Sequence, residues 1–188
     1  AEGIDVDTLG NIYFVGYTYS HPASAIVHPF YQNSGSAYVD STQSGGDGFI
    51  VHLRADGQFV YWASYLGGTG VDRARAVAVS PITGDIYVVG AGDSTGFPVS
   101  GITEWDNSYG GGMVWKFRSD GELSHSGFIG PNSGGAIING ILVDDIGHVV
   151  IAGATPGGFP VTAGCAQFNY AGGTTDGFLA KLSGYKDN

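Results

Sequence analysis

Charged side chains are scarce in this chain of 188 residues. They make up 13% of it, against about 25% in an average globular protein. The 17 acidic residues outnumber the seven basic ones, which gives a formal net charge of −10. Phosphate backbones and anionic lipid surfaces repel such a protein, and no cluster of Lys and Arg offsets the repulsion. The sequence therefore argues against nucleic-acid binding and membrane insertion, and the acidity favours solubility.

Several other patterns are absent. Cys165 is the only cysteine, so the chain has neither an internal disulfide nor a thiolate metal cluster. No apolar run approaches the roughly 18 residues that a membrane helix requires. The first residues lack the basic and apolar segments of a signal peptide, as expected also for a trimmed form of a longer protein. No segment of useful length has apolar residues at helical spacing, which argues against helices.

Glycine is abundant instead. The chain has 34 glycines, without the every-third spacing of collagen, together with 43% hydrophobic and 13% aromatic residues. Most of the glycines stand at turns between apolar, aromatic-rich runs. This arrangement is typical of an all-β protein with many tight connections.

A strand, a glycine turn and a strongly apolar strand occur three times along the chain, and each set predicts a hairpin. The three hairpins are expected at 3–16, 76–90 and 140–153. A third strand follows each hairpin, at 47–53, 112–117 and 176–182. In the first two units, an Asp-Gly turn then leads to a fourth strand, at 58–66 and 122–129.

Runs of four strands that repeat after tens of residues are how propeller blades appear in sequence. We therefore predict an all-β fold of about three four-stranded antiparallel blades of the β-propeller type. They form a single repeat domain, 1–188, with units at approximately 1–72, 73–135 and 136–188. Such blades bury their faces only against their neighbours, so the units must pack in a ring or a stack.

The segment 47–68, DGFIVHLRADGQFVYWASYLGG, resembles the core of the bacterial SBBP repeat, a seven-bladed β-propeller repeat. The segment 10–18, GNIYFVGYT, and the Phe-Pro pairs at 97–98 and 159–160 resemble its other half. The second unit departs from the pattern, because Gly112 replaces the opening Asp and the segment 127–130 replaces the Tyr-Leu-Gly-Gly ending. The resemblance implies a propeller in a large exported or cell-surface bacterial protein, and it brings no catalytic residues.

The third unit stops at Leu182 without a fourth strand, so the predicted set is open. Common propellers have four to eight blades, and an open ring leaves strand edges exposed. The chain is then a fragment of a longer one, a subunit whose copies complete a ring, or an open stack against a partner. We favour the first or the last of these, with a protein partner or further blades as neighbours.

Three carboxylates are the candidates for a metal site. Asp5 and Asp7 alternate along one predicted strand and so point to one face, and Asp144 takes the place of Asp7 in the third unit. In a propeller the innermost strands line a channel, where carboxylates can hold Ca²⁺. The alternative is that they accept backbone hydrogen bonds from the following turn. We favour the alternative, because Ser80 stands at this position in the second unit, and we predict no resident cofactor.

Aromatic side chains are the candidates for a binding surface. Exposed aromatics beside Asn and Asp stack on sugar rings or anchor protein partners, whereas aromatics that alternate along strands pack between blades. The candidates lie in a connecting loop, in a long insertion at 19–46 and on the predicted outer strand of the first unit. They are Trp105, Asn107 and Tyr109; Phe30, Tyr31 and Tyr38; and Tyr61 and Trp62.

No catalytic motif appears in the sequence. It has no Gly-x-Ser-x-Gly elbow, Cys165 has no histidine nearby, and the five histidines lack metal-ligand spacing and are expected in loops or on the surface. We predict that the protein is not an enzyme but a structural or interaction module that is extracellular, at the cell surface or periplasmic. The alternative is a glycan-binding, lectin-like module, and a hydrolase with an acidic channel is the least favoured interpretation.

Overall fold

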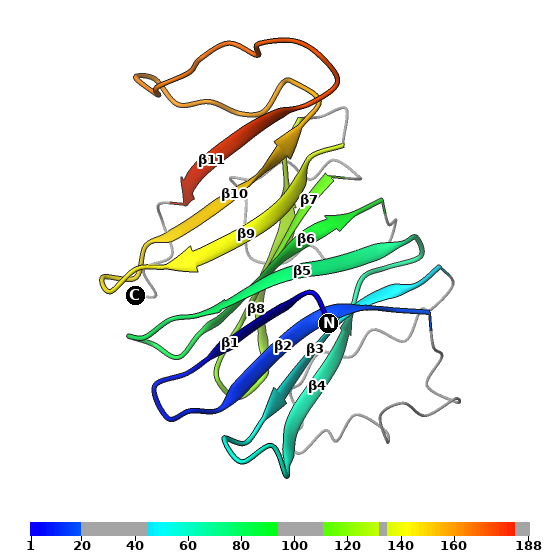
Figure 1. Ribbon diagram of the computed structural model, residues 1–188, viewed down its shortest axis with the longest axis vertical. Helices are drawn as coiled ribbons and strands as arrows, with labels where there is room; N and C mark the ends of the chain where they lie inside the picture. The colour runs from blue at the N-terminus through cyan, green and yellow to red at the C-terminus, as the bar shows by residue number, and fades with distance from the viewer. Residues whose placement is uncertain (20–44, 94–110, 132–134, 183–188) are drawn as a thin grey trace.

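The computed structural model is all-β and describes residues 1–19, 45–93, 111–131 and 135–182 (Figure 1). Sheet 1 contains β1 (Gly3–Val6), β2 (Ile12–Thr18), β3 (Asp47–Leu53) and β4 (Val60–Leu66). Sheet 2 contains β5 (Asp72–Val79), β6 (Ile86–Gly92), β7 (Gly111–Phe117) and β8 (Leu123–Ile129). Sheet 3 contains β9 (Ile137–Val143), β10 (Val149–Thr155) and β11 (Asp176–Leu182). The all-β prediction is confirmed, and no helix of the described residues is long and apolar enough to cross a membrane.

Each sheet is an antiparallel meander whose strands pair in chain order. The first hairpin of each unit turns through a glycine with positive φ, at Gly10, Gly84 and Gly147, where a larger side chain would be strained. The polar residue directly after the preceding strand, which is Asp7, Ser80 or Asp144, accepts hydrogen bonds from backbone N–H groups of this turn. A side-chain acceptor of this kind is present in all three units and stabilises each hairpin turn.

The three sheets stack face to face along the long axis of the molecule, sheet 1 at one end and sheet 3 at the other (Figure 1). We call the face of a sheet that points toward the start of the stack its leading face, and the opposite one its trailing face. The trailing face of sheet 1 and the leading face of sheet 2 share one core, which includes Tyr13, Trp62, Val88 and Trp115. The trailing face of sheet 2 and the leading face of sheet 3 share a second core.

The second core includes Val89, Val114, Val149 and Ile151. Because side chains alternate along a strand, sheet 2 needs apolar residues on both faces, and its strand β7 is buried throughout. The sheets at the two ends of the stack each have one face with no neighbouring sheet among the described residues.

The first strands of the sheets, β1, β5 and β9, follow one another through the stack (Figure 1). The carboxylate of Asp5 accepts a hydrogen bond from the backbone N–H of Val79 at 2.8 Å and so joins β1 to β5. The guanidinium of Arg75 donates to the side-chain oxygen of Asn139 at 3.3 Å and joins β5 to β9. These contacts hold neighbouring sheets together at one edge, and the described sheets do not close into a ring.

Candidate functional site

The three carboxylates considered as metal ligands all accept backbone hydrogen bonds. Asp7 accepts from the N–H groups of Leu9 and Asn11 and from the Asn11 side-chain amide. Asp144 accepts from the N–H groups of the corresponding turn and from the His148 ring at 2.8 Å. With the Asp5 bond across the sheets, each of the three carboxylates thus makes the backbone hydrogen bonds of the turn-acceptor alternative or of a contact between sheets. The described residues contain no group of three His, Cys, Asp or Glu placed to hold an ion.

The same hydrogen bonds set the acidity of two of these groups. Burial raises the pKa of Asp7, but the bonds from Asn11 and Leu9 outweigh it and hold the pKa below its usual value. The backbone N–H of His148 is the main reason that the pKa of Asp144 is also lowered. Both groups are therefore carboxylates at neutral pH.

The aromatic candidates of the first unit lie in or against the core. Trp62 is 3% exposed and packs in the core between sheets 1 and 2, where its ring lies 5.7 Å from that of Phe117. Tyr61 is half-buried beside it. Both fit the packing alternative rather than a ligand surface. The other aromatic candidates lie outside the described residues: Phe30, Tyr31, Tyr38, Trp105, Asn107 and Tyr109.

A polar side chain is buried on the trailing face of sheet 1. His52 is 6% exposed, it stacks on the ring of Tyr13 at 4.1 Å, and Trp62 contacts it edge-on. Neither ring nitrogen has a hydrogen-bond partner among the described residues. Burial therefore lowers the pKa of His52 to about 4, although the Asp7 carboxylate opposes the shift. The expectation that the histidines lie in loops or on the surface is wrong for His52.

Lys116 takes the position of His52 in sheet 2. Its side chain is 1% exposed, and its ammonium nitrogen lies 3.1 Å from a carboxylate oxygen of Asp85. The ammonium also lies 5.6 Å from the centre of the Tyr87 ring. The pair belongs to the face that packs against sheet 3, where the Asp85 carboxylate and the Tyr87 ring both lie near the buried ammonium.

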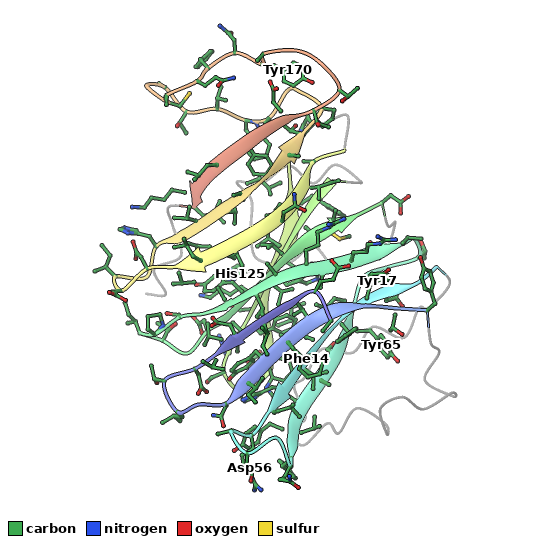
Figure 2. The ribbon with its side chains drawn as sticks, viewed as in Figure 1. Phe14, Tyr17, Asp56, Tyr65, His125 and Tyr170 are labelled. Atoms are coloured by element: carbon green, nitrogen blue, oxygen red, sulfur yellow. The ribbon has the colours of Figure 1, made fainter. Side chains whose placement is uncertain are left out.

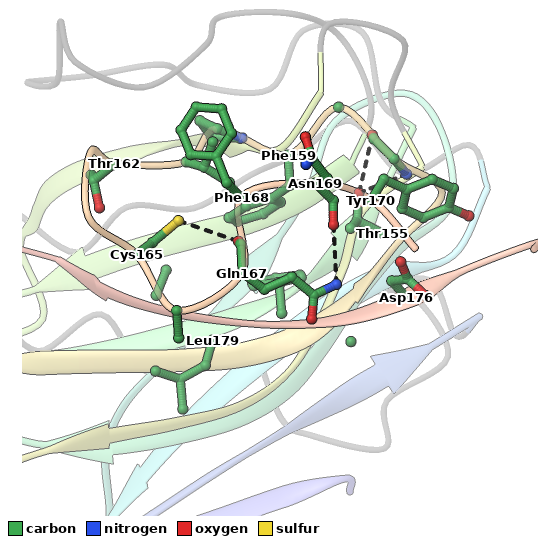
Figure 3. Close-up of a pocket in the computed structure, with 18 of the residues that line it drawn as sticks. Thr155, Phe159, Thr162, Cys165, Gln167, Phe168, Asn169, Tyr170, Asp176 and Leu179 are labelled. Carbon is green, nitrogen blue, oxygen red and sulfur yellow. Dashed lines mark hydrogen bonds between the residues drawn. The ribbon is translucent and has the colours of Figure 1, made fainter. Parts of the chain in front are cut away.

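A pocket of about 700 Å³ lies beneath the loop 156–175 that joins β10 to β11 (Figure 3). Phe159 and Phe178 stack at 3.9 Å in its lining and pack against the second core. Phe168 and Tyr170 also line it and are 63% and 39% exposed. The loop lies at the sheet 3 end of the molecule, far from Phe14 of sheet 1 (Figure 2).

Hydrogen bonds within the loop shape this pocket (Figure 3). The Cys165 thiol donates to the carbonyl of Gln167 at 3.2 Å, and the Gln167 amide donates to the carbonyl of Asn169 at 3.1 Å. The carboxylate of Asp176 accepts from the backbone N–H of Ala171. The lining therefore combines exposed aromatic rings with amide groups. Among the described residues, the lining of this pocket includes no histidine.

Sequence reasoning missed the aromatics of this pocket. Phe168 and Tyr170 flank Asn169 in a glycine-containing loop, and Trp105 and Tyr109 flank Asn107 in the same way in the second unit. Aromatic residues flanking an Asn in a loop were the signal in the sequence that could have identified this pocket. It did not show that the third-unit loop folds back over its own sheet.

Comparison with known proteins adds no relative. No known protein family and no curated protein sequence matches the chain. The functional interpretation therefore depends on the repeat pattern and on the geometry of the sheets and the pocket.

Proposed function

We propose that this chain is a non-catalytic structural and interaction module, made of β-propeller-type blades, in a secreted or cell-surface bacterial protein or assembly. The observation that carries the proposal is the stack itself. Three antiparallel sheets of related sequence bury their faces against one another, and among the described residues the sheet at each end has one apolar face with no neighbouring sheet. Large exposed apolar surfaces are typical of sites where another protein binds.

The placement of the first strands supports the propeller part of the proposal. In a propeller the innermost strands of successive blades lie next to one another around an axis. Here β1, β5 and β9 follow one another, and side chains join β1 to β5 and β5 to β9. The resemblance to the SBBP repeat supports export and a place at the cell surface.

In-cell photo-crosslinking tests the proposal. A photoreactive amino acid replaces Leu179, on the open face of sheet 3, or Ile146, an equally exposed residue in a hairpin turn. We expect a crosslinked protein from the cell envelope with the Leu179 variant and none with the Ile146 variant. A protein that is found only in the cytoplasm, with no crosslink from either position, would contradict the proposal.

The pocket under the loop 156–175 favours a second candidate function, glycan binding. Phe168 and Tyr170 offer exposed ring faces, and Gln167 and Asn169 offer amides, the combination that stacks on sugar rings and hydrogen-bonds their hydroxyls. A glycan array tests it, with a Phe168→Ala/Tyr170→Ala variant as the control. A silent array would rule out this function. A glycosidase would need two carboxylates across a cleft, and the pocket lining has only Asp176.

A further inference from the structure

The open face of sheet 3 differs in exposure from the same face of the other sheets. Leu179 of β11 corresponds to Val114 of β7 and Ile50 of β3, because each of them comes three residues after the first residue of its strand. Leu179 is 75% exposed, whereas Val114 is 1% and Ile50 0% exposed. Leu142, on the same face, is 52% exposed, and its counterpart Ala78 is 5% exposed. Leu179 also lines the pocket under the loop 156–175, but among the described residues no sheet covers the trailing face of sheet 3, which thus has the residues of a packed face without a neighbouring sheet.

The leading face of sheet 1 shows the same contrast. Ile4 is 70% exposed and its counterpart Val77 6% exposed. Val6 is 55% exposed and its counterpart Val79 8% exposed. Ile4 pairs with Phe14 in the register, as Val77 pairs with Val88, so the two sheets carry matching apolar rows on this face.

The existing interfaces show how such faces meet. The first strand of each following sheet lies across the preceding sheet: β5 contacts all four strands of sheet 1, and β9 contacts β5, β6 and β7 of sheet 2. A further first strand that packed on sheet 3 in the same way would lie across β9, β10 and β11. It would need exposed apolar residues on its leading face. In this chain β1 is such a strand, because Ile4 and Val6 point outward from it.

We infer that the trailing face of sheet 3 binds the leading face of sheet 1 of a second copy of this chain, head to tail, with β1 of one copy across β9–β11 of the other. The inference rests on the proposed function and names its partner. It follows from continuity, since this contact repeats the two sheet interfaces already present in the molecule. The two faces differ, so the contact is heterologous and cannot form between two like faces.

Lys181, on the trailing face of sheet 3, is compatible with this contact. Lys181 stands where Lys116 stands in sheet 2 and His52 in sheet 1, and both of those side chains are buried beneath the next sheet. A polar residue at this position is therefore normal in a packed sheet face. The long stem of Lys181 also allows its amine to stay at the rim of the contact.

Two face-blocked variants test the inference. Ile4→Glu/Val6→Glu blocks the leading face, and Leu142→Glu/Leu179→Glu blocks the trailing face; all four side chains are at least half exposed, so folding does not depend on them. The matched control is Ile82→Glu/Ile146→Glu, which adds the same charge at exposed turn residues. Circular dichroism and melting temperature verify that each variant is folded.

The readout is the mass in solution from light scattering. We expect the wild-type chain and the control variant to exceed the monomer mass of 19.4 kDa as concentration rises. Each blocked variant alone stays at 19.4 kDa, because the face that it needs is missing. An equimolar mixture of the two blocked variants forms a 1:1 dimer of twice that mass, through one intact leading face and one intact trailing face.

Three results would overturn the inference. One is a wild-type chain that stays monomeric up to about 1 mM, the dissociation constant of a very weak complex. Another is association of either blocked variant by itself, and the third is a mixture that does not form the 1:1 dimer. If the chain is monomeric but Leu179 crosslinks to another envelope protein, the proposed function stands and the second copy is the wrong partner.

Discussion

The ion pair of Lys116 and Asp85 provides a quantitative test of how a charge is held between sheets 2 and 3. The Asp85→Ala substitution removes the carboxylate that lies next to the Lys116 ammonium, whose side chain is 1% exposed. At the observed 3.1 Å, the attraction is about 5 kcal/mol for an effective dielectric constant of about 20. Leaving one member of a buried pair alone typically costs about 3–5 kcal/mol of unfolding free energy. We expect a loss of that size for Asp85→Ala.

The assay is a double-mutant cycle by urea denaturation, followed through tryptophan fluorescence; Trp62 and Trp115 are both buried. Lys116→Met should destabilise the protein in the same way, because it leaves Asp85 unpaired. The double variant removes both charges and should regain most of the loss, with a coupling energy of about 3 kcal/mol. Losses that simply add in the double variant would refute the reasoning.

A solvent-exposed pair provides the control for this cycle. Arg118 and Glu122 lie 2.7 Å apart, closer than the buried pair, but their side chains are 59% and 44% exposed. The same cycle on this pair should give a coupling energy below about 1 kcal/mol, and added salt should weaken it further. If both pairs gave equal coupling energies, burial would not be the cause of the effect.

Three further predictions concern backbone packing, pH and the acidic candidates. The β-carbon of a Gly90→Ala variant would overlap the carbonyl oxygen of Arg73, so urea denaturation should show a loss of about 1–3 kcal/mol in unfolding free energy. The control is Gly140→Ala, whose β-carbon would have no atom within 4 Å and which should show no loss. Because burial lowers the pKa of His52 to about 4, against about 6.5 when unfolded, the unfolded chain takes up the proton first as pH falls. Stability should therefore be complete above about pH 6.5 and decrease by about 3 kcal/mol toward pH 4, and melting curves of His52→Phe should lack this decrease. Asp5→Ala should lose about 1 kcal/mol with its bond to β5, and calcium should leave the melting temperature of wild-type protein unchanged; a rise that Asp5→Ala abolishes would instead indicate a metal site.

The strands were predictable because their signals are local. The expected third strand of the second unit, 112–117, differs from β7 by one residue, and the expected fourth strand, 122–129, differs from β8 by one. Glycine turns such as those at Gly57 and Gly121 have the positive φ that Asp-Gly sequences favour. Alternating apolar residues between such turns are enough to specify a strand.

The candidate site was harder to predict, because exposure depends on what packs against a face. Phe168 and Tyr170 line a pocket only because the loop 156–175 folds back over β11 and places them there. His52 sits in an ordinary strand pattern, and nothing in its local sequence shows that sheet 2 covers it. The same holds for Trp62, which the sequence left open between a binding surface and the core.

The sequence by itself determined the all-β class, the order of the strands and the repetition of the units, since turn residues and alternation act over a few neighbours. Tertiary structure alone decided which faces are buried. Val114 and Leu179 occupy the same place in the same repeat, yet one is 1% and the other 75% exposed. The physical reason is that a strand in a stack is apolar on both sides, so its pattern identifies two packing faces, and only the neighbouring sheet determines which of them is covered.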